Sequence, residues 1–131
     1  MTSDALRTYP LGPHYAHLDA LAEIRPIEVT PEFWQGGVNA LPPGRLISTF
    51  ETAADWDTWE RHPIGEEFIL QLEGAMRLHV EGADGDVSTA DLPAGHFIVV
   101  PTGLWHTADV IEPGRALYIT AGEGTEVRSR A

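Results

Sequence analysis

The sequence predicts an all-β domain, a β-sandwich or jelly roll with little helix. The 13 glycines and 10 prolines among 131 residues exceed the average of roughly 12% for the two types, so turns are frequent and long helices are disfavoured. From Pro26 onward, short apolar runs alternate with Gly/Pro breaks, which is typical of such folds. We expect nine strands, near residues 26–30, 45–51, 57–62, 66–73, 75–81, 86–91, 96–100, 106–111 and 115–121.

The predicted strand over 66–73 alternates between two faces. One face carries Phe68, Leu70 and Leu72, and the other carries Glu67, Ile69, Gln71 and Glu73. If Glu67 points into the fold, the first set forms an exposed apolar face. Large faces of this kind are rare in soluble monomers, so we expect a homodimer.

The N-terminal residues 1–25 mix Pro, Gly and polar groups, with one helix-like stretch from His14 to Ile24. We therefore divide the chain into an N-terminal segment, 1–25, and a single domain, 26–131. A length of 131 residues suits one ordinary domain.

Composition excludes several kinds of chemistry. The chain has no cysteine, all eight of its basic residues are arginine, and the formal net charge is −12. Lysine Schiff bases, P-loops, thiolate nucleophiles and cysteine-bound zinc are therefore ruled out. The negative charge disfavours nucleic acid and anionic membranes as partners. Since the N-terminus shows no basic region followed by an apolar stretch, we expect a cytoplasmic protein.

Four titratable residues are placed to meet inside the predicted fold. Glu60 and His62 are two apart on one strand and leave it from one face. Glu67 follows the turn at 63–65, and His106 follows the turn at 101–103. Buried carboxylates and imidazoles need partners, and a divalent cation would satisfy all of them at once.

The spacing around these residues resembles the cupin superfamily. His62-x4-Glu67-x6-Gly74 matches the latter part of the first cupin motif, and Gly95-x5-Pro101-x-Gly103-x2-His106 matches the second through its histidine. The resemblance covers roughly residues 45–121. It implies a double-stranded β-helix, or jelly-roll barrel, that holds a divalent metal.

The resemblance also implies the metal ligands, namely His62, Glu67 and His106, with Glu60 standing where the family has its first histidine. Val110 stands where the second motif ends in asparagine. Glu60 could coordinate the metal, which would favour manganese or iron over copper, or act as a general base. The metal itself, Mn, Fe, Ni or Zn, is left open.

The first functional hypothesis is a metal-dependent, dioxygenase-like oxidoreductase acting on a small organic molecule. Two alternatives stay open: a non-redox isomerase, lyase or hydrolase that uses the metal as a Lewis acid, and a non-catalytic binding or sensing module. Gln71 shares a face with Glu67 and is the candidate polar group for orienting a substrate, or else a satisfied core amide.

Overall fold

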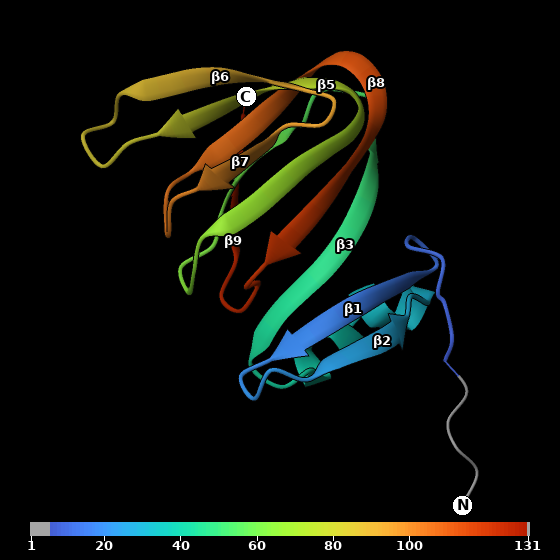
Figure 1. Cartoon of the computed structure of the whole chain (residues 1–131). Coiled ribbons are helices and arrows are strands. Elements are labelled where there is room, and N and C mark those ends of the chain that lie inside the picture. The colour runs from blue at the N-terminus through green and yellow to red at the C-terminus, as the bar shows by residue number, and fades with distance from the viewer. Residues whose placement is uncertain (1–5, 131) are drawn as a thin grey trace, which may run out of the picture.

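The computed structural model describes residues 6–130 and consists almost entirely of antiparallel strands (Figure 1). The helical elements are two short turns, α1 (Pro31–Trp34) and the 3₁₀ helix η1 (Gly37–Ala40). The strands are β1 (His14–Asp19), β2 (Ile24–Glu28), β3 (Gly44–Thr52), β4 (Thr58–Arg61), β5 (Glu67–Glu81), β6 (Val87–Pro93), β7 (Phe97–Val100), β8 (His106–Thr120) and β9 (Glu126–Ser129).

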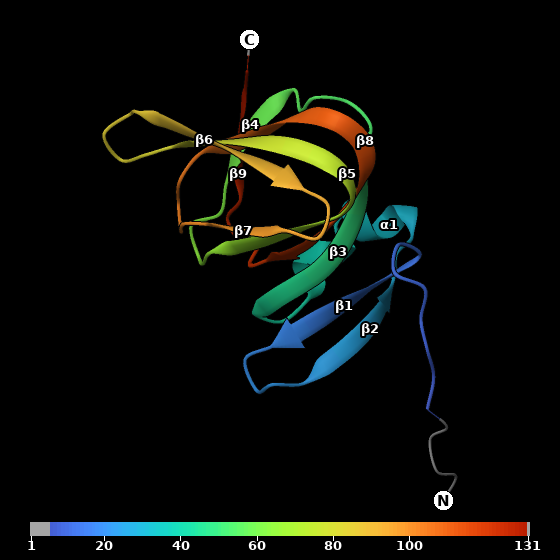
Figure 2. The ribbon, with the colours of Figure 1, turned by 45° about the horizontal axis from the view of Figure 1, so that its top comes forward.

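The sheet curls into a jelly-roll barrel, which confirms the predicted fold class (Figure 2). One path of hydrogen-bonded neighbours runs β2-β1-β3-β8-β4-β9, and β5 joins it by pairing with β8 as well as with β6 and β7. The two longest strands, β5 and β8, have 15 residues each and bend through the barrel. Each of them replaces two of the strands predicted from the sequence.

A register shift in β5 sets which side chains enter the barrel. Glu67, Ile69 and Gln71 point inward, and beyond the shift Met76 and Leu78 do so. The chain passes this irregular stretch at Gly74, whose φ is +73° and where an added Cβ would lie 2.4 Å from the carbonyl oxygen of Glu112. Only glycine fits there without strain.

The hydrophobic core fills the barrel interior from β5 through β8. It consists of Ile69, Met76, Leu78, Leu92, Val100, Ala108, Ala116 and Tyr118. On the outer face of the same sheet, Leu72, Phe97 and Val99 are exposed, and Phe68 stacks on Phe97 with ring centroids 4.9 Å apart. The predicted inner face of β5 is therefore confirmed for Glu67, Ile69 and Gln71. It is wrong for Glu73, which is exposed because the register shifts on either side of it.

The predicted helix from His14 to Ile24 is wrong. Residues 14–19 form β1, which pairs with both β2 and β3, and the chain turns back over 20–23. Tyr15 and His17 are the buried residues of β1, a period of two that suits a strand and not a helix. The expected boundary after residue 25 falls inside β2.

The C-terminal stretch around Glu126 forms β9 against β4 and was not predicted as a strand.

None of the helices among residues 6–130 has the length and apolar character needed to cross a membrane.

Candidate metal centre

Three strands bring the four predicted residues together. Glu60 lies on β4, His62 directly follows that strand, and Glu67 opens β5 after the turn. His106 opens β8 and is the register partner of Glu60 in the β4–β8 pairing. The arrangement depends on the alternation of the strands, since residues 60 and 62 leave the chain on the same side.

The imidazoles of His62 and His106 face the same carboxylate. His62 Nε2 lies 3.2 Å from Glu67 Oε2, and His106 Nε2 lies 3.0 Å from Glu67 Oε1. All three side chains are buried, with 7%, 5% and 0% of the surface of His62, Glu67 and His106 exposed. Glu60, His62 and His106 each offer one ligand atom, and these atoms lie within 4.8 Å of one another.

Hydrogen bonds at the outer nitrogens orient both rings. The Nδ1–H of His106 donates to the carbonyl oxygen of Leu104 over 3.3 Å. His62 Nδ1 lies 2.7 Å from the hydroxyl of Thr125, which itself donates to the carbonyl oxygen of Gly122. The hydroxyl therefore accepts from His62, so both rings carry a proton on Nδ1 and direct Nε2 inward.

The inward-facing atoms lack hydrogen-bond partners among residues 6–130. Although His62 Nε2, His106 Nε2 and Glu67 Oε1 lie close together, none of them makes a well-directed hydrogen bond. Thr120 donates to Glu67 Oε2 over 2.6 Å, which leaves Oε1 without a donor. Buried polar atoms without partners cost free energy, and a divalent cation would satisfy all three. The residues present therefore fit a metal ion.

The charges of the cluster are strongly coupled. Burial alone would raise the pKa of Glu67, but the imidazoles of His106 and His62 outweigh it and hold the pKa at about 2. Burial would lower the pKa of His106, yet Glu67, the Leu104 carbonyl and Glu60 together raise it. The imidazoles and the carboxylate bind a metal only in their deprotonated forms, so metal binding displaces protons.

Glu60 differs from Glu67. It is half-buried, and burial, reinforced by the charge of Glu67, raises the pKa of its carboxyl. Its side chain makes no hydrogen bond or ion pair with another residue in the described part of the chain. It is free either to approach a metal or to exchange a proton with a ligand in the pocket.

A pocket of about 870 Å³ opens onto this cluster, and Glu60, His62 and Glu67 are part of its lining. Its wall includes four aromatic side chains, from α1, β3, the β3–β4 connection and β8: Trp34, Phe50, Trp56 and Tyr118. The size and the mixture of aromatic and polar groups suit a small organic molecule.

The structure does not place Gln71 at this pocket. Its side chain is fully buried, and its amide nitrogen donates to the carbonyl oxygen of Glu73 over 2.7 Å and to Thr52 Oγ1 over 3.4 Å. The arrangement resembles a core amide, although its Oε1 has no partner among residues 6–130.

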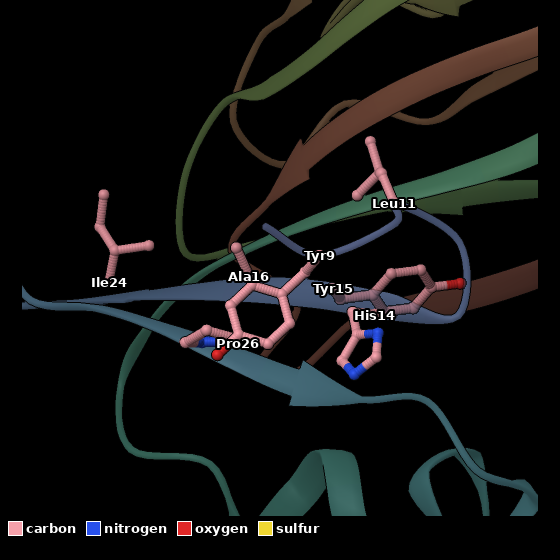
Figure 3. Close-up of a pocket in the computed structure, with 7 residues that line it drawn as sticks. All are labelled: Tyr9, Leu11, His14, Tyr15, Ala16, Ile24 and Pro26. Atoms are coloured by element: carbon pink, nitrogen blue, oxygen red, sulfur yellow. The ribbon is translucent and has the colours of Figure 1, made fainter. Parts of the chain in front are cut away.

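A second, smaller hollow of about 230 Å³ lies at the N-terminal hairpin (Figure 3). Its lining consists of Tyr9, Leu11, His14, Tyr15, Ala16, Ile24 and Pro26. His14 is its one potential nitrogen ligand among the lining side chains, so this hollow does not provide a second metal site.

Sequence reasoning missed the residues that support the ligands. Thr120 lies two positions from Tyr118 on β8, so the alternation of that strand could have placed its hydroxyl inside. Thr125 belongs to a turn after β8 and carried no pattern that would link it to His62. Trp56 lies in a connection, and its contact with His106, 5.9 Å between ring centroids, depends on the tertiary fold.

Comparison with known proteins agrees with this fold. A family model described as a cupin domain matches residues 46–121. Among solved structures, an oxalate oxidase is 18% identical with a TM-score of 0.52 and covers 62% of this chain and 44% of its own. Peruvianin-I, a cysteine peptidase from Thevetia peruviana latex, is 16% identical with a TM-score of 0.55. It covers 66% of this chain and 56% of its own.

Oxalate decarboxylase from Bacillus subtilis, a protein with Mn(II) centres, is 26% identical with a TM-score of 0.52 and covers 66% of this chain and 23% of its own. The chain thus spans about a quarter to about half of the length of these proteins. No curated protein matches it by sequence.

Proposed function

The chain belongs to the cupin family, and on that basis we propose that it is a metal-dependent enzyme that acts on a small organic molecule, with dioxygenase-like oxidoreductase chemistry. The observation that carries the proposal is the convergence of His62 Nε2, His106 Nε2 and Glu67 Oε1, all buried and without hydrogen-bond partners in the described chain, beside a pocket of about 870 Å³.

The donor set favours iron or manganese. Two imidazoles and one carboxylate with open positions are typical of non-haem iron sites that react with oxygen. The Mn(II) centres of the Bacillus subtilis oxalate decarboxylase make manganese the other candidate. When bound, such a metal would supply Lewis acidity and one-electron redox chemistry.

The chain's own residues supply positioning and proton transfer. Leu104 and Thr125 fix the two imidazoles, and Thr120 fixes the carboxylate of Glu67. Trp56 and Tyr118 line the pocket next to the cluster and form part of its aromatic wall. If Glu60 is not a ligand, its raised pKa suits it to take or return a proton on the bound substrate.

Replacing Glu60 tests its role. Glu60→His restores the cupin pattern at that position. If Glu60 is a ligand, the variant keeps a metal but shifts its preference toward softer ions. If Glu60 is a base, the variant keeps the same metal and loses turnover. Unchanged metal preference and unchanged activity would show that Glu60 does neither.

The main experiment measures metal content and oxygen reactivity separately. Protein purified without a metal-binding tag is analysed for metals, then loaded anaerobically with Fe(II) and exposed to nitric oxide, whose iron adduct has a distinct electron paramagnetic resonance signal. We expect one metal per chain and an adduct in the wild type and neither in His106→Ala. A metal-free protein that takes up no Fe(II) or Mn(II) would overturn the proposal.

Oxygen dependence then separates the reaction classes. A redox enzyme stops without oxygen, whereas a Lewis-acid isomerase, lyase or hydrolase works anaerobically and tolerates zinc. Ligand binding without any turnover would indicate a sensing module.

We also propose a homodimer. Leu72, Phe97 and Val99 are exposed on the outer sheet face, by 40%, 60% and 44%, and a second copy could cover them. Light scattering at micromolar concentration should return twice the mass of the chain. A monomer would contradict this proposal.

A further inference from the structure

The pocket has a strongly unbalanced charge. Its lining contains six carboxylates and one guanidinium, namely Glu51, Asp55, Asp57, Glu60, Glu67, Glu123 and Arg45. With a dication added at the metal centre, these groups still leave a net charge of −3. The side chain of Arg45 is exposed, and the carboxylates outnumber it six to one.

The pocket carboxylates outside the metal centre are only weakly neutralised by the rest of the chain. Glu51 lies 3.8 Å from Arg115, in an exposed pair that screening makes weak. Asp55 Oδ1 accepts from the backbone N–H of Val110 over 2.7 Å. The side chains of Asp57 and Glu123 make no hydrogen bond or ion pair with other described residues. The pocket therefore attracts positive charge.

Aromatic rings line the pocket from its mouth to the metal centre. Trp34 and Phe50 have centroids 5.9 Å apart, Phe50 and Tyr118 5.7 Å, and Tyr118 and Trp56 6.4 Å. Trp56 in turn lies 5.9 Å from the metal-ligand candidate His106. Aromatic faces attract organic cations and bury apolar carbon.

The inner end of the pocket is a built site. His62 and Glu67 are 7% and 5% exposed, and both belong to the lining. Their Nε2 and Oε1 atoms have no hydrogen-bond partner in the described chain. A ligand held against the aromatic wall would thus reach these polar atoms or the metal that they hold.

We propose that this pocket takes an organic cation, a small molecule that carries an ammonium group on an apolar or aromatic body, and disfavours organic carboxylates. The ammonium lies among the carboxylates, and the body lies against Trp34, Phe50 and Tyr118. The inference deepens the proposed function, because it names the substrate class of the same site.

The test uses three probes of nearly equal shape: 2-phenylethylamine, 2-phenylethanol and 3-phenylpropionate. Calorimetry measures their affinity for the metal-free and the zinc-loaded protein at low ionic strength. We expect the amine to bind at least about tenfold more tightly than the carboxylate in both forms, with the alcohol between them, and the difference to shrink at 0.5 M salt as charges are screened. A carboxylate that equals the amine in either form, or no binding by the amine, would overturn the proposal.

Matched variants locate the effect. The double variant Asp57→Asn/Glu123→Gln should lose at least about threefold in amine affinity while alcohol affinity is unchanged. Asp91→Asn removes a carboxylate that pairs with Arg77 outside the pocket and should change neither affinity. If the double variant keeps the wild-type amine affinity, these carboxylates do not select the ligand and the inference is wrong.

The metal content of the same samples is measured in parallel. Amine selectivity without any metal would leave this inference standing while the proposed enzyme fails. A protein that binds a metal but does not prefer the amine would support the proposed function and overturn this inference.

Discussion

Inside the barrel, Met76 and Leu78 are fully buried among aliphatic side chains, whereas the inward positions near the starts of β5 and β8 carry Glu67 and His106. The same two strands thus build both regions. Alternation alone points all of these residues inward, so the regions differ in side-chain chemistry and not in backbone construction.

The aliphatic region serves stability, and the polar region serves metal binding. The aliphatic region gains free energy from apolar burial, while the polar region buries atoms without hydrogen-bond partners, which costs free energy until a cation occupies the site. Substitutions in the two regions should therefore have opposite consequences.

The largest effect is expected from Glu67→Gln, which removes the shared carboxylate charge. Metal affinity should fall at least about a thousandfold, or about 4 kcal/mol, while unfolding of the metal-free protein changes by less than about 2 kcal/mol. Calorimetric metal titration and urea unfolding in a chelator measure the two quantities. Asp91→Asn is the control with the same charge change on the outer face. If Glu67→Gln keeps the wild-type metal affinity, the distinction between the two regions is wrong.

The aliphatic region should respond in the opposite way. Leu78→Ala leaves a cavity and should lower the free energy of unfolding by about 2–5 kcal/mol, with metal affinity per folded molecule nearly unchanged. Leu21→Ala, in the turn after β1 and 83% exposed, is the control and should cost much less. A loss of metal affinity that matched the loss of stability would show that the regions are not independent.

Thr125→Val sharpens the comparison at the edge of the polar region. The hydroxyl that orients His62 disappears, and metal affinity should fall by about 10- to 100-fold. Thr89→Val removes a similar contact, 2.9 Å from His79 Nδ1, on the outer face and should leave metal affinity unchanged. If Thr125→Val and Thr89→Val bind the metal equally well, Thr125 does not contribute to the site.

The smallest effect lies outside both regions. Hydrogen bonds from His79 and Arg130 lower the pKa of Asp109 below its ordinary 3.8, so its charged form stabilises the fold above about pH 4. That contribution disappears as the pH falls through the lowered pKa. Because the group is partly exposed, the effect stays below about 1 kcal/mol. Asp109→Asn should flatten the acid side of the unfolding curve, and an unchanged pH profile would refute this assignment.

Much of the barrel and the core of the site could be predicted because they depend on alternation and spacing. The inward set Glu67, Ile69 and Gln71 followed from a period of two. The approach of His62 to Glu67 followed from the turn between them, at 63–65. Strand alternation is local, so one sequence reveals it.

The remaining features depend on contacts between distant segments. The pattern of residues 14–24 suited a helix until pairing with β3 imposed a strand. Thr125 contacts His62 across 63 residues, and Trp34 and Phe50 enter one pocket only through the tertiary fold. Gln71 shares the inward face with Glu67, but alternation does not say how far along the barrel the pocket extends.

The hydrogen bond that His62 donates to Thr125 also has a consequence for biosynthesis. The ligands first appear at residue 62, but the last one is His106, and the hydroxyl that sets the tautomer of His62 comes at residue 125. A chain emerging from the ribosome therefore presents Glu60, His62 and Glu67 long before the site can close. The complete donor set, with His62 oriented by Thr125, therefore exists only once the barrel has folded through residue 125.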